Sequence, residues 1–145
     1  MQSLFGVPLY LLHPMMVHFP IALLIVGFGA ALLARWKRSP DWLPKAAAWM
    51  LWTGTLLLWL VLALGLLAEN KAQHVPPAWK DLYEHKWWAW RAAWAFTGLS
   101  LWRWLAGRRL EWATLLAWLG CVALLAVAAH HGAELVYTWG MGVAP

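Results

Sequence analysis

The sequence predicts an all-α integral membrane protein, an antiparallel up-down four-helix bundle. Its composition carries this prediction: 63% of the 145 residues are apolar and 12% are charged, whereas soluble proteins average about 45–50% apolar and about 25% charged residues. A chain of this length has too little interior to bury so much apolar surface in water. The surplus requires lipid, which excludes a soluble enzyme, a disordered tail and a disulfide-stapled secreted module.

Four runs are long and apolar enough to cross a hydrocarbon core about 30 Å thick, which takes about 20 helical residues. The predicted spans are residues 14–36, 44–68, 80–105 and 110–131, followed by a C-terminal tail over 132–145. These runs lack the alternating pattern of membrane barrels. Pro14 is expected in the first turn of the first helix, and Gly132 is expected to cap the last. The chain is therefore expected to be one four-span domain over residues 1–145, and no internal sequence repeat is visible.

Basic residues gather in the first and third connections between these spans. They are Arg35, Lys37, Arg38 and Lys45 in the first, and Arg103, Arg108 and Arg109 in the third. Because positive charge marks cytoplasmic loops, we expect a bacterial inner-membrane protein with both termini and the balanced middle connection on the periplasmic side. The net charge of +5 then reflects topology, and no nucleic-acid partner is expected.

This topology places all six histidines at the periplasmic end of the bundle. They are His13, His18, His74, His85, His130 and His131. Ionisable side chains in membrane spans are rare and usually functional, and imidazole is a common ligand of haem iron, copper and zinc. Ala22 and Ala89, one turn beyond His18 and His85, leave room for a flat macrocycle. The histidines therefore predict a non-covalent haem or metal site.

Depth along the helices selects the expected ligands. If the first span begins at Pro14, His18 lies about 6 Å inside it, level with His85 and His130, whereas His13 precedes the helix. We expect His18 to be one axial ligand and His85 or His130 to be the other. His13 is expected to serve a second, shallower haem or to hydrogen-bond a ligand.

Two segments near the ends of the chain carry specific motifs. Residues 13–24 read HPMMVHFPIALL, and residues 129–143 read AHHGAELVYTWGMGV. These segments resemble the patterns HPxxVHFPIA and GHxGGxLVYxxGxGV of an uncharacterised bacterial membrane family, domain of unknown function 2231, with Ala129 and Ala133 in place of glycines. By this resemblance His13, His18 and His130 are motif histidines, and His85 matches the histidine that opens the third span.

Related domains are fused to Rieske iron–sulfur and c-type cytochrome domains, so the resemblance implies respiratory or photosynthetic electron transfer. We therefore expect a haem-b-binding subunit of a larger redox complex with cytochrome or iron–sulfur subunits, and not a stand-alone enzyme. It is expected to hold one or two haem b groups and to exchange electrons with quinone. A cofactor-free structural or assembly subunit and a copper-binding membrane protein remain open as alternatives.

Two further features bear on this expectation. Arg91, on the outer half of the third span, either meets a haem propionate or reaches the lipid headgroups. The 15 tryptophans exceed what two interfacial belts need, and tryptophan favours surfaces that are partly apolar and partly wet. This excess favours contact with other subunits through the outer connection and the C-terminal tail.

The orientation can be tested with a Ser39→Cys variant in intact cells. Because Ser39 lies in a basic connection, we expect a membrane-impermeant maleimide to label it only after the membrane is permeabilised. The parent chain, whose one cysteine is Cys121, supplies the background. Labelling of the Ser39→Cys variant in intact cells, where the maleimide reaches only the outer side, would refute the predicted orientation.

Overall fold

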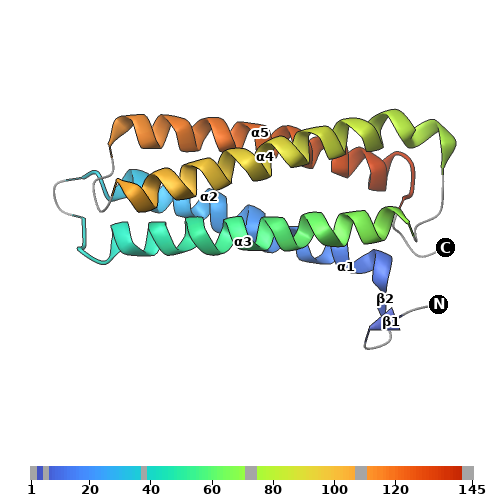
Figure 1. Ribbon diagram of the computed structural model, residues 1–145, viewed down its shortest axis with the longest axis horizontal. Coiled ribbons are helices and arrows are strands. Elements are labelled where there is room, and N and C mark those ends of the chain that lie inside the picture. Colours follow the sequence, from blue (N-terminus) through green and yellow to red (C-terminus); the bar gives the residue numbers. More distant parts are fainter. Residues whose placement is uncertain (1–2, 5–6, 37–38, 71–74, 107–110, 142–145) are drawn as a thin grey trace.

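The computed structural model describes residues 3–4, 7–36, 39–70, 75–106 and 111–141. Within these ranges the helices form a bundle of four rods that run alternately up and down (Figure 1). The first rod is a broken helix, α1 (Leu9–Met16) and α2 (His18–Leu33), and the others are α3 (Leu43–Glu69), α4 (Trp79–Leu105) and α5 (Trp112–Tyr137). A 3-10 helix, η1 (Pro76–Ala78), leads into α4, and β1 (Ser3–Leu4) pairs with β2 (Val7–Pro8) ahead of α1. The predicted all-helical class is confirmed, apart from this small pairing.

Three of the described helices are long and apolar enough to cross a membrane. They are Tyr10–Leu33, Leu43–Glu69 and Trp112–Tyr137. Helix α4 is of similar length, but its 27 residues include six formal charges and seven tryptophans. A fourth crossing by α4 therefore stays a prediction.

The alternating directions of the rods determine which helix ends lie together at each end of the bundle. The C-terminal ends of α2 and α4 lie at the same end as the N-terminal ends of α3 and α5, opposite the end that holds α1 and the C-terminal end of α5 (Figure 1). Of the residues used to predict orientation or the histidine cluster, Lys37, Arg38, His74, Arg108 and Arg109 lie outside the described residues. Which side of a membrane each end faces stays a prediction.

The first helix begins earlier than the sequence predicted. Because the apolar run of residues 9–12 extends the helix, α1 starts at Leu9, and Pro14 lies inside it. The prediction that His13 precedes the helix was therefore wrong. The helix is interrupted at Val17, where Pro20 has no N–H to donate to the carbonyl of Met16 four residues back. Val17 keeps φ −58° and ψ −29°, so the rod continues in nearly the same direction.

The last helix ends later than predicted. Helix α5 continues through Gly132 to Tyr137, so Gly132 is not a cap and the predicted tail begins as helix. The chain leaves the helix near Gly140, whose φ of 65° is the left-handed conformation that glycine adopts after helix C-termini. Arg103, which the sequence placed in the third connection, lies instead in the last turn of α4 with a buried side chain. At this end of a helix, the dipole stabilises a positive charge.

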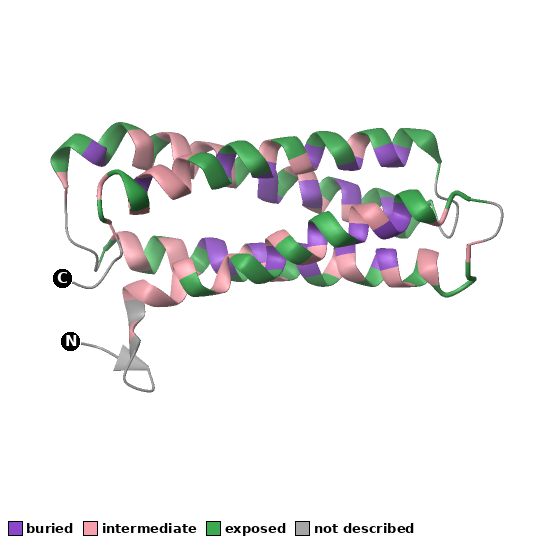
Figure 2. Ribbon diagram, turned by 180° about the vertical axis from the view of Figure 1, so that it is seen from behind, coloured by how far each residue is buried: buried purple, intermediate pink, exposed green. Residues whose placement is uncertain are grey.

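The core follows the inward faces of the rods, while the outward faces are exposed (Figure 2). Two glycines let α2 and α3 approach closely. A Cβ at Gly54 would lie 2.8 Å from Cδ2 of Leu24, and a Cβ at Gly27 would lie 2.9 Å from Cβ of Met50. The fully buried Trp118 of α5 donates its indole N–H to the Leu24 carbonyl over 3.1 Å. Small residues and this interhelical hydrogen bond thus help to hold the centre of the bundle together, as is common in membrane bundles.

Polar side chains join α3 to α4. The hydroxyls of Thr55 and Ser100 lie 2.9 Å apart, and the indole N–H of Trp59 donates to Oγ1 of Thr97 over 2.9 Å. In an apolar surrounding each of these groups would be unfavourable without a partner. Ser100 and Thr97 of α4 are therefore paired with side chains of α3.

The close packing of α2 and α3 predicts a stability difference between two glycine variants. Gly54→Ala should destabilise the bundle by about 1–3 kcal/mol, because an added methyl group in a filled core forces its neighbours apart. Gly120→Ala is the control, since a Cβ there meets nothing within 4 Å and alanine favours a helix over glycine. Thermal unfolding in detergent measures both. Equal midpoints would contradict the close approach.

Candidate cofactor site

A pocket lies between the rods at the end of the bundle that holds α1, and we call it the histidine pocket. Its volume is about 560 Å³, within the range of about 300–1,000 Å³ for small-molecule and cofactor sites. All four rods contribute to its wall, which is mainly apolar. Its polar lining residues include His13, His18, Glu69, His85 and Lys86. Apolar walls with a few polar groups are the usual character of a cofactor site.

His13 reaches from α1 to α3. Its Nδ1–H donates to the carbonyl of Val61 over 2.9 Å. The ring lies against Gly65, one turn further along α3, where a Cβ would come within 3.0 Å of the ring carbon Cε1. Gly65 therefore lets the imidazole lie directly on the surface of α3.

His85 reaches from α4 to α5 in the same way. Its Nδ1–H donates to the carbonyl of Ala128 over 2.8 Å. The ring lies against Gly132, one turn beyond Ala128, where a Cβ would come within 2.9 Å of Cε1. The glycine that the sequence suggested as a helix cap thus makes room for a histidine.

The two arrangements repeat one pattern. In each, a histidine on the first helix of a hairpin donates to a carbonyl on the second helix and packs against the glycine four residues after that carbonyl. One half of this repeat consists of α1, α2 and α3, and the other half consists of α4 and α5. No repeat is visible in the sequence, because the two halves share only isolated positions.

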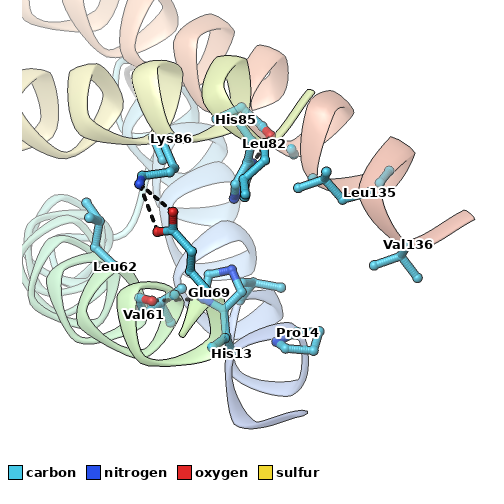
Figure 3. A pocket seen from close by; sticks show the side chains of 18 of the residues that line it. His13, Pro14, Val61, Leu62, Glu69, Leu82, His85, Lys86, Leu135 and Val136 are labelled. Atoms are coloured by element: carbon cyan, nitrogen blue, oxygen red, sulfur yellow. Dashed lines mark hydrogen bonds and ion pairs between the residues drawn. The ribbon is translucent and has the colours of Figure 1, made fainter. Parts of the chain in front are cut away.

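The imidazoles of His13 and His85 face one another across the histidine pocket (Figure 3). Their ring centres are 6.1 Å apart and their planes are nearly perpendicular, at 78°. A carbonyl can only accept, so Nδ1 carries the proton in each ring, and the lone pair of Nε2 is available to a metal. Histidines that bind metals are usually oriented by such a hydrogen bond.

The separation of the rings suits a single ion between them. With metal–nitrogen bonds of about 2 Å, two imidazoles on opposite sides of one ion have ring centres about 6 Å apart. The observed 6.1 Å matches this spacing. The distance between the two rings is therefore compatible with one ion held through both Nε2 atoms.

The structure does not bring the other residues predicted for the site into the facing pair. His18 lines the pocket but is exposed, and His130 is exposed and lies 3.5 Å from Glu134 between Nε2 and Oε1. Arg91 is exposed, with its guanidinium over the ring of Trp87. Because α1 starts at Leu9, His13 is part of the helix and lies opposite His85. His18 is five residues further on, and five residues turn a helix by about 140°, so it does not share this face.

An ion pair that sequence reasoning missed lies in the histidine pocket. Nζ of Lys86 on α4 donates to both carboxylate oxygens of Glu69 on α3 at 2.8 Å (Figure 3). From the sequence these residues were interpreted as balancing charges of the middle connection. The available signal was that Lys86 directly follows His85. The pair supplies both a cation and a carboxylate beside the two rings.

Comparison with known proteins gives one match. The model of a family described as predicted membrane protein (DUF2231) matches residues 10–145. No curated protein and no solved structure matches the chain. The matched range contains both histidines of the facing pair, their two acceptor carbonyls and the two glycines beneath the rings.

Proposed function

Since the chain belongs to the DUF2231 family of predicted membrane proteins, we propose that it is a haem-b-binding membrane subunit in which His13 and His85 would hold the haem iron. One observation supports this most strongly: two imidazoles with Nδ1 bound to helix carbonyls face each other 6.1 Å apart in a pocket of about 560 Å³. Helical bundles commonly build cofactor sites from side chains on facing helices.

The residues of the histidine pocket fit haem b. Leu58, Leu62 and Leu125 supply apolar wall for a macrocycle. Lys86 offers a cation to a propionate in the place for which the sequence suggested Arg91, and Glu69 holds that lysine between α3 and α4. When bound, haem b supplies a one-electron carrier, whose potential depends on its axial ligands and burial.

The protein's own contribution is to fix and tune the two ligands. The carbonyls of Val61 and Ala128 hold each ring in one orientation, and the hydrogen bond that Nδ1–H donates raises the basicity of Nε2. Burial by the surrounding leucines limits the access of water. Rings held in advance lose little conformational freedom on binding, which favours affinity.

The position of the pocket favours exchange of electrons at the end of the bundle that holds α1, which we propose faces the periplasm. Trp79, Tyr83 and Tyr137 near this end are all more than half exposed. We propose that they contact a cytochrome or iron–sulfur subunit, with quinone from the bilayer as a further electron donor or acceptor. Tryptophan and tyrosine suit such surfaces, which are partly apolar and partly wet.

The haem proposal predicts a spectrum that depends on two histidines. Protein purified in mild detergent should contain one haem b per chain and show a reduced-minus-oxidised α band. His13→Ala and His85→Ala should each lower haem content by more than 10-fold, since losing a ligand exceeds the effect of about 10–100-fold that follows the loss of an outer partner. His130→Ala is the control and should keep the full spectrum.

Two glycine variants separate ligand geometry from general stability. Gly132→Ala displaces the ring of His85 and should weaken haem binding by about 10–100-fold, whereas Gly120→Ala on the same helix should not.

The same mild-detergent preparation should carry the proposed cytochrome or iron–sulfur subunit. Full haem content in both histidine variants would contradict the ligand assignment, and a colourless parent protein would favour the cofactor-free alternative.

A further inference from the structure

A second group of ligand atoms lies where the start of α4 meets the end of α5. Asp81 of α4 and His131 and Glu134 of α5 each offer one atom, and these atoms all lie within 4.8 Å of one another. Nδ1 of His131 is 3.6 Å from Oε2 of Glu134 and 4.0 Å from Oδ1 of Asp81. We call these three residues the carboxylate–histidine cluster.

Direct hydrogen bonding does not account for these distances. Hydrogen bonds between nitrogen and oxygen span about 2.7–3.2 Å, and both separations from Nδ1 are longer. Nδ1 of His131 is buried and has no hydrogen-bond partner within the part of the chain that the structure describes. Since a buried polar atom without a partner is unfavourable, a ligand between the three side chains would relieve it.

The spacing instead resembles that of atoms around one metal ion. Nitrogen and oxygen ligands bind zinc at about 2.0–2.2 Å, so two ligands of one ion lie about 3–4 Å apart. The separations of 3.6 and 4.0 Å are at the upper end of this range. All three ligand atoms lie within 4.8 Å of one another, so both carboxylates would have to turn inward to bind one ion.

A hydrogen bond from outside the cluster holds one of the two carboxylates in position. Oδ2 of Asp81 accepts the indole N–H of Trp139 at 2.8 Å, which leaves Oδ1 directed to His131. Oε1 of Glu134 lies 3.5 Å from Nε2 of His130, which is longer than a hydrogen bond, and Oε2 is the oxygen near His131. Carboxylates that bind metals are commonly oriented in this way by a second hydrogen bond.

We propose that Asp81, His131 and Glu134 bind a divalent cation of the zinc class. Imidazole nitrogen with carboxylate oxygens is a zinc donor set, and two carboxylates with a neutral imidazole balance the charge of the ion. Asp81 and His131 are about one-fifth exposed, at 22% and 21%, so an ion can enter and water can take the remaining position. The site joins the start of α4 to the end of α5 and shares no residue with the His13–His85 pair.

The test is a titration of the full-length protein in detergent with Zn²⁺ alone, after removal of metals with a chelator. Calorimetry should give one Zn²⁺ per chain. Asp81→Asn and His131→Ala should each weaken binding by more than 10-fold, because a lost ligand exceeds the outer-partner effect of about 10–100-fold. Glu84→Gln, one turn further along α4 and outside the cluster, removes the same charge as Asp81→Asn and should leave binding unchanged.

Circular dichroism of each variant separates a lost ligand from a lost fold. A parent chain that binds no Zn²⁺, or a folded Asp81→Asn variant that binds it as tightly as the parent, would overturn the proposal. The haem proposal does not enter this test, because the chelator should leave haem content unchanged and His13→Ala should keep its zinc.

Discussion

The hydrogen bond from a histidine Nδ1–H to a helix carbonyl organises the end of the bundle that holds the pocket. It occurs twice, from His13 to Val61 and from His85 to Ala128. Leaving a buried donor without a partner costs about 1–3 kcal/mol, so each bond ties one helix to the next and fixes the tautomer of the ring. The remaining nitrogen of each ring then becomes available in the pocket, and the proposed haem ligation depends on this single constraint.

Glycine serves two purposes along the rods. At the centre, Gly27 and Gly54 bring two backbones together, and the space is filled by Leu24 and its neighbours. At the pocket end, Gly65 and Gly132 admit imidazole rings in place of a neighbouring backbone. The first use closes the bundle, whereas the second places a polar ring between helices and leaves the histidine pocket beside it.

The sequence was sufficient for the helical class, the approximate positions of four rods and the gathering of histidines at one end, because apolar runs and their alternation along the chain determine these features. The pairing of ligands was beyond it. Whether His13 or His18 faces His85 depends on helix rotation, which the sequence does not determine, and on where the helix begins, which proved to be Leu9. The roles of Gly132 and Lys86 depend on contacts with residues distant in sequence. Such contacts leave little trace in local pattern.

The most direct test of the central claim is the tautomer of the two imidazoles in protein free of haem. Nitrogen NMR of the chain labelled with ¹⁵N-histidine, with His13→Ala and His85→Ala used to assign the signals, reports which ring nitrogen carries the proton. The account predicts a protonated Nδ1 and a bare Nε2 for both residues, as their carbonyl partners require. A proton on Nε2 of either ring would contradict it, because that ring could neither donate to its carbonyl nor bind a metal through Nε2 as proposed.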